Sequence, residues 1–124
     1  MNVVLWIVAG LLAVAFLMVG LMKMTRPKAQ LAESGLEWTE DFSPRTVKLI
    51  GTLELLAAIG LVIPAVTGIA PVLVPMAAIG LVVLMIGAIA VHIRRHEARM
   101  IVGNLVLLVL AALVAWGRLG PYAF

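Results

Sequence analysis

Four apolar stretches dominate the sequence, and each is long enough to cross a lipid bilayer as an α-helix. They cover about residues 3–22, 46–63, 72–91 and 101–117, and a helix needs roughly 20 residues to span the hydrocarbon core. Hydrophobic residues make up 65% of the chain and charged residues only 12%, which excludes an ordinary soluble domain. We therefore predict an all-α fold, a transmembrane four-helix bundle built from antiparallel hairpins.

The connections between these stretches are short, so the 124 residues are predicted to form a single domain, residues 1–124. The longest connection opens with Pro27 and contains Gly35, a helix-start and a helix-stop signal, which predict a short interfacial helix over residues 27–34. In the second stretch, Pro44 suits the first helical turn and Pro64 is predicted to end the helix.

Positive charges gather on two of the connections, which indicates how the chain is oriented. Only Arg118 and the amino terminus carry positive charge on the opposite side, so the positive-inside rule places both termini outside and the charged loops in the cytoplasm. We expect a multi-pass protein with periplasmic or extracellular termini, surrounded by the lipid bilayer. The cations that border the two connections are Lys23, Arg26, Lys28, Arg45, Lys48, Arg94, Arg95 and Arg99.

Composition also excludes several kinds of chemistry. The chain has no cysteine, so it forms no disulfide and transfers no electrons through thiols. The net charge of +3 is explained by membrane topology, and we predict no nucleic-acid partner. No metal-ligand spacing, phosphate-binding glycine loop or nucleophile triad is present, so no metal site is predicted and the cofactor is unknown.

Glu54 is a carboxylate in the middle of the second apolar stretch. An ionised acid at such a depth costs about 2.5–3.5 kcal/mol on insertion scales, so acids there face the protein interior, pair with a cation or serve a function. Helical spacing places Glu54 on a stripe of small residues, the type through which membrane helices approach each other. We therefore expect Glu54 to point into the bundle. The stripe consists of Val47, Gly51, Glu54, Ala58 and Leu61.

Each of the other stretches also offers one inward-facing polar residue. Lys23 ends a small-residue stripe in the first stretch, His92 lies near the end of the third, and Asn104 lies near the start of the fourth. All three lie toward the cationic connections, and Glu54 lies about 9 Å deeper than Lys48 at the rise of an α-helix. We hypothesise a polar, ligand-binding pocket formed by Lys23, Glu54, His92 and Asn104 at the cytoplasmic end of the bundle.

Each of these residues also has a purely structural interpretation. Glu54 could form an ion pair or an interhelical hydrogen bond instead of binding a ligand or moving a proton. His92 could serve at a helix end or interface instead of in acid–base chemistry. Lys23 could be a snorkelling topology marker, and Asn104 could hold two helices together.

Several short motifs at these positions resemble the DoxX-like family over essentially the whole chain. The resemblance implies a bacterial inner-membrane protein with four helices, whose polar positions are Lys23, Glu54, His92 and Asn104. It implies little about activity, because the family name derives from subunits associated with quinone-linked sulfur oxidation and respiration. The matching motifs are Gly20-Leu21-Met22-Lys23, Gly51-Thr52-Leu53-Glu54-Leu55, Gly60-Leu61-Val62-Ile63-Pro64, His92-Ile93-Arg94-Arg95 and Asn104-Leu105-Val106-Leu107.

Two classes of function follow as hypotheses. In the first, the protein is a noncatalytic membrane module that binds a lipophilic small molecule such as a quinone, or docks a membrane oxidoreductase partner. In the second, it is a small enzyme in which Glu54 and His92 are the catalytic acid and base, with Lys23 or Asn104 stabilising developing negative charge. Pairing with a second copy of the chain, as a homo-oligomer, is left open.

Overall fold

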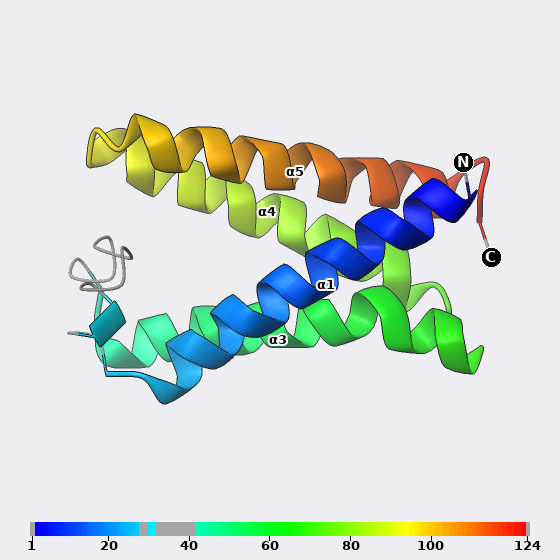
Figure 1. The fold of residues 1–124 in the computed structure, drawn as a ribbon, viewed down its shortest axis with the longest axis horizontal. Helices are drawn as coiled ribbons and strands as arrows, with labels where there is room; N and C mark the ends of the chain where they lie inside the picture. Colours follow the sequence, from blue (N-terminus) through cyan, green and yellow to red (C-terminus); the bar gives the residue numbers. More distant parts are fainter. Residues whose placement is uncertain (1, 28–29, 32–41, 124) are drawn as a thin grey trace.

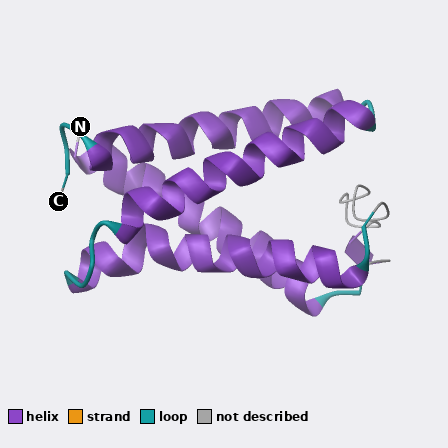
Figure 2. Cartoon of the chain, turned by 180° about the vertical axis from the view of Figure 1, so that it is seen from behind, coloured by secondary structure: helices purple, strands orange, loops and turns teal. Residues whose placement is uncertain are grey.

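The computed structural model describes residues 2–27, 30–31 and 42–123. It contains four long helices, α1 (Asn2–Thr25), α3 (Pro44–Thr67), α4 (Leu73–Arg94) and α5 (Ala98–Leu119), and no strand occurs in the part of the chain that it describes. Figure 2 shows this all-helical architecture. All four helices are long and apolar enough to cross a membrane. The predicted fold class, a helical bundle with four candidate spans, is confirmed.

The observed helices are longer than the predicted ones, with 24 residues each in α1 and α3 and 22 each in α4 and α5. Most notably, α3 does not end at Pro64, as the sequence predicted, but continues to Thr67 and stops at Gly68, whose φ is 72°. An unpaired backbone group is costly in an apolar surrounding, so continuing the helix past a single proline costs less than unravelling its last turn. Thr67 Oγ1 also donates to the carbonyl of Ile63 at 2.9 Å.

The other proline signals lie where helices tolerate them. Ser43 precedes α3 and its Oγ accepts from the amide of Thr46 at 3.2 Å, with Pro44 as the first helical residue. Pro75 lies in the first turn of α4, where its missing amide hydrogen has no partner to lose. The short interfacial helix predicted over residues 27–34 lies outside the described residues, except for Pro27, Gln30 and Leu31.

The helices form two pairs that meet at one end of the molecule and separate toward the other (Figure 1). We call the end with the two chain termini the terminal end, and the end where α1 and α4 stop and α3 and α5 begin the charged end. Helix α1 runs diagonally, beside α3 at the charged end and beside α5 at the terminal end. The two pairs, α1 with α3 and α4 with α5, therefore leave space between them at the charged end.

Glycines mark the closest contact within the first pair. A Cβ on Gly20 of α1 would lie 2.8 Å from the carbonyl oxygen of Gly51, and a Cβ on Gly51 of α3 would lie 2.7 Å from Cβ of Lys23. These distances are shorter than a side chain tolerates, so only glycine permits this crossing. The small-residue stripes that the sequence predicted on both helices are the surfaces in contact, and every stripe residue of α3 is buried.

The outward faces of all four helices carry exposed large apolar side chains, such as Leu11, Val83 and Val109. Such surfaces are unfavourable in water and suit the lipid surroundings of a membrane span. Inside the bundle, a continuous apolar core includes Leu12, Phe16, Leu61, Leu81 and Val114. Among the described residues, the charged side chains that are buried are Lys23, Glu54, His92 and Arg118.

One of those positions, Arg118, fastens the terminal end. Its guanidinium is buried, and its Nη1 donates to Oδ1 of Asn2 at 2.6 Å and to the carbonyl of Tyr122 at 2.9 Å. The same group lies 5.8 Å from the centre of the Trp6 ring, within the range of cation–π attraction. The charge pattern of the sequence indicated Arg118 only as a topology marker, whereas in the structure Arg118 joins the first turn of α1 to the end of α5.

Replacing Arg118 by leucine is expected to lower the free energy of unfolding by about 1.5–3 kcal/mol, the usual value of hydrogen bonds to charged groups. The acceptor oxygens of Asn2 and Tyr122 would lose their donor. The measurement is denaturant titration of the purified protein in detergent, followed by circular dichroism. Arg94→Leu, which removes an exposed arginine at the charged end, is the control, and an equal loss in both variants would contradict a specific role for Arg118.

Candidate functional site

Lys23 and Glu54 form a buried ion pair between α1 and α3. Nζ of Lys23 donates to Oε1 of Glu54, and the two residues are only 5% and 3% exposed. The close crossing of Gly20 and Gly51, one helical turn away on each helix, brings the two backbones near enough for this contact. A buried carboxylate needs such a partner, because an unpaired buried charge is strongly destabilising.

His92 forms a second pair at the end of α4. Its Nδ1 shares a hydrogen bond of 2.9 Å with Oε1 of Glu97, which also accepts from Nε of Arg95 at 3.2 Å. The chain turns sharply between α4 and α5, with His96 at a φ of 57°, and this turn brings Glu97 back over the histidine. His92 is only 2% exposed, so Glu97 fixes the orientation of a buried imidazole.

Asn104 of α5 differs from the other polar residues of the site. Its Nδ2 is buried and has no hydrogen-bond partner among the described residues. An amide nitrogen buried without an acceptor costs about 1–3 kcal/mol, so a native structure holds one only for a reason.

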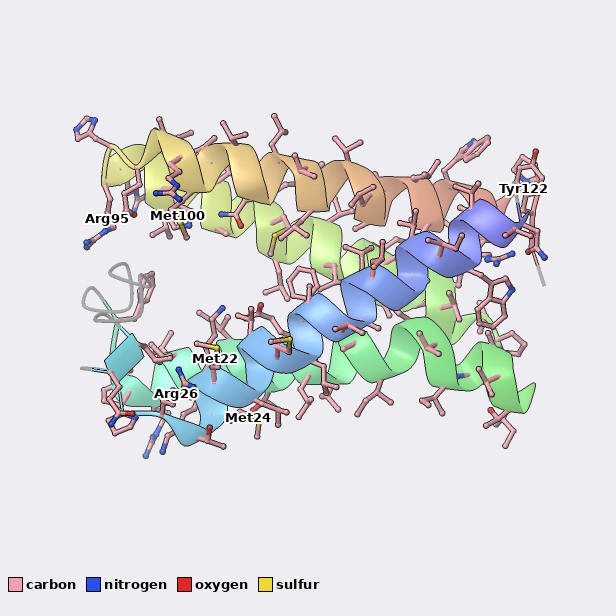
Figure 3. The ribbon with its side chains drawn as sticks, viewed as in Figure 1. Met22, Met24, Arg26, Arg95, Met100 and Tyr122 are labelled. Atoms are coloured by element: carbon pink, nitrogen blue, oxygen red, sulfur yellow. The ribbon has the colours of Figure 1, made fainter. Side chains whose placement is uncertain are left out.

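A cavity of about 760 Å³ between the two helix pairs brings these residues together, since Lys23, Glu54, His92 and Asn104 all line it. Most of the remaining lining is apolar and includes Phe16, Val83, Leu84 and Leu107, contributed by α1, α4 and α5. Figure 3 places Arg95 and Met100 at the same end of the molecule as Met22 and Arg26, and Tyr122 at the opposite end. Met100 also lines the cavity, which therefore lies toward the charged end.

The comparison with protein families agrees with this architecture. The model of the DoxX-like family matches residues 7–114, which include all of α3 and α4, most of α1 and α5, and all four predicted site residues. The chain belongs to the DoxX-like family. Searches of curated proteins and of solved structures find no match to it. Family membership and four apolar helices together identify a multi-pass membrane protein.

In this DoxX-like protein, the four predicted residues surround one cavity but do not form one hydrogen-bonded cluster. The structure pairs His92 with Glu97 and leaves Nδ2 of Asn104 without a partner among the described residues. Lys23 pairs with Glu54 and His92 pairs with Glu97, while Asn104 lies on another part of the cavity wall.

Two charged residues of this region were not singled out by sequence analysis. Glu97 escaped notice because its contact with His92 depends on a turn conformation that helical spacing does not reveal. Arg99 was counted only as an orienting charge, although it lines the cavity from the first turn of α5. The short charged connection between two apolar stretches was a signal for Glu97. A tight turn there brings Glu97 next to His92, five positions earlier.

Four side chains on the cavity wall of this DoxX-like protein carry hydrogen-bond donors: Lys23, His92, Arg99 and Asn104. Among the described residues of the lining, Glu54 is the carboxylate. No three histidine or acidic side chains of residues 2–27, 30–31 and 42–123 lie close enough to hold a metal ion. The arrangement is suited to holding the polar end of an otherwise apolar molecule.

Proposed function

We propose that this DoxX-like protein binds a lipophilic small molecule in the cavity between its two helix pairs, with the polar end of the molecule among Lys23, His92 and Asn104. The observation that carries the proposal is the cavity itself. Its volume of about 760 Å³ falls in the range of roughly 300–1,000 Å³ typical of small-molecule sites, and its few polar groups lie on a mainly apolar wall as in such sites. Quinones, with an acceptor-bearing ring and an apolar tail, are one class that fits.

The bilayer is the natural source of such a molecule. Val83, Gly87 and Gly103 line the cavity and are also exposed on the outside of the bundle, which favours access from the surrounding lipid. We further propose that the protein lies in the bacterial inner membrane with its charged end in the cytoplasm. The distribution of cations between the two ends, with Arg118 at the terminal end, supports this orientation.

The ion pair between Lys23 and Glu54 favours ligand binding over acid–base catalysis as the function of this site. Glu54 is held by Lys23 and His92 is held by Glu97, and the two are contributed by different walls of the cavity. A general base must lie within hydrogen-bond reach of the proton that it removes, so catalysis would require Glu54 to exchange its lysine partner for substrate. Binding requires no such rearrangement.

Replacing Gly87 by leucine is expected to weaken ligand binding at least tenfold, because one extra methylene in an apolar pocket already changes binding by about 1–3 kcal/mol. A Cβ on Gly87 would have no atom within 4 Å, so the new side chain occupies the cavity without disturbing packing. Affinity for decylubiquinone, measured in nanodiscs by tryptophan fluorescence, is the readout. Native mass spectrometry of protein extracted with its own lipids would identify the natural occupant.

Gly80→Leu is the matched control for this experiment. Gly80 lies two turns before Gly87 on the same face of α4, its Cβ would also have no atom within 4 Å, and it does not line the cavity. We expect Gly80→Leu to bind as the unmodified protein does. If Gly87→Leu retains both the copurifying molecule and the affinity for decylubiquinone of the Gly80→Leu protein, the cavity is not a binding site.

A further inference from the structure

The charges on the cavity wall are unevenly matched. Lys23 and Glu54 neutralise each other, and Glu97 behind the wall is already engaged by His92 and Arg95. Among the described residues of the lining, Arg99 is the other charged one, and it forms no ion pair with any of the residues that the structure describes. The lining therefore carries one positive charge that no described carboxylate balances.

Arg99 has the right chemistry and position to receive an anion. A guanidinium keeps its charge at any physiological pH and presents a planar fork of donors that matches a carboxylate or phosphate. Arg99 lies in the first turn of α5, at the charged end, and is exposed. It can therefore reach a head group that stays near the membrane surface while the rest of the molecule lies in the cavity.

Asn104 supplies an independent indication of the same kind. Its buried Nδ2 lacks an acceptor among the described residues, and it lies on the same helix as Arg99, about 7.5 Å further into the bundle at the rise of an α-helix. Two groups on α5 thus offer donors to the cavity, and Nδ2 of Asn104 is a buried one with no acceptor in the described part of the chain.

We infer that the molecule held in the cavity is a single-chain amphiphile with an acidic head group, a carboxylate or phosphate monoester, which pairs with Arg99. Nδ2 of Asn104 donates to an oxygen of the same molecule, and the alkyl chain lies against Phe16, Val83 and Leu107. This inference rests on the proposed function and narrows its ligand class. A neutral quinone satisfies Asn104 but leaves the guanidinium unbalanced.

The size of the cavity agrees with one chain. Its volume of about 760 Å³ is of the order that encloses a drug-sized ligand, whose sites span roughly 300–1,000 Å³. A phospholipid with two acyl chains is larger than a drug-sized ligand, so a single-chain amphiphile fits this volume better.

The test compares head groups on one alkyl chain. Palmitate, hexadecyl phosphate and hexadecanol are titrated against the protein in nanodiscs of neutral lipid, with decylubiquinone as a fourth probe. We expect at least one of the two acids to bind about tenfold or more tightly than the alcohol, which is the usual scale of a charge-assisted hydrogen bond. The relative affinities of palmitate and hexadecyl phosphate show which acid the site prefers.

Arg99→Gln is expected to abolish this preference for acids while leaving hexadecanol binding within about twofold. Arg94→Gln is the matched control, because Arg94 is an exposed arginine at the same end that does not line the cavity. It removes the same charge from the surface and should keep the preference. Both arginines are exposed, so neither substitution should prevent folding.

The outcomes separate this inference from the function on which it rests. Equal affinities for acids and alcohol, a preference that survives Arg99→Gln, or a preference lost equally in Arg94→Gln would overturn the acidic head group. Binding of decylubiquinone and hexadecanol that is blocked by Gly87→Leu would still support the proposed function in each of these cases. Failure of all four probes to bind better to the unmodified protein than to Gly87→Leu would instead refute the proposed function itself.

Discussion

Replacing either member of the buried ion pair alone, by Lys23→Met or Glu54→Leu, is expected to lower the free energy of unfolding by about 3–5 kcal/mol, whereas replacing both together should restore most of it. Removing one partner leaves an uncompensated charge inside the bundle, which is strongly destabilising, while apolar residues of similar volume at both positions are often tolerated. Lys23 and Glu54 are almost completely buried, so bulk solvent stabilises the remaining charge only weakly.

The measurement is a double-mutant cycle from denaturant unfolding in detergent, with Lys48→Met as a control. Lys48 is an exposed lysine near the start of α3, and its loss should change stability by no more than about 0.5 kcal/mol. Single-variant effects below about 1 kcal/mol, or a double variant as unstable as the sum of the single ones, would show that the pair does not hold α1 and α3 together.

Gly20→Leu is the second substitution with a large expected effect, a loss of at least about 3 kcal/mol, at the upper end for small-to-large changes in a core. A Cβ at this position would lie 2.8 Å from the carbonyl oxygen of Gly51 and 3.1 Å from the amide nitrogen of Leu55. Both are backbone atoms that no rotamer change can move, so α1 and α3 must separate. The separation would also pull Lys23 away from Glu54.

Gly10→Leu provides the comparison on the same helix, because a Cβ on Gly10 would meet no atom within 4 Å. Its stability should stay close to that of the unmodified protein. Thermal unfolding of both variants in the same detergent, followed by circular dichroism, checks the difference. Similar unfolding temperatures for the two variants would show that the crossing of α1 and α3 adapts to a side chain.

Local periodicity explains why much of the bundle could be predicted. The spacing of Gly51, Glu54 and Ala58 depends only on the repeat of an α-helix, and these residues are buried in the structure as expected. The same repeat places Lys23 and His92 on inward faces, and both are buried. A helical repeat predicts which way a side chain points, and this was sufficient to identify four polar residues that line the cavity, Lys23, Glu54, His92 and Asn104.

The contacts between particular side chains and the ends of the helices could not be predicted from helical periodicity. The contact between His92 and Glu97 depends on the backbone of the turn at His96, and the pairing of Arg118 with Asn2 depends on how α1 crosses the bundle. Neither is a property of a single helix. The end of α3 beyond Pro64 was predicted wrongly because a proline rule derived from local sterics ignores the cost of unpaired backbone groups in an apolar surrounding.

The hydrogen bond between Arg118 and Asn2 joins residues 116 positions apart in the chain, and this separation sets the order in which the protein can be assembled. During synthesis, α1 and α3 can pair early, because both are translated before α4 and α5. The first turns of α1 must wait for the last turn of α5 before they acquire their partner. This contact at the terminal end of the bundle therefore forms only after α5 has been translated.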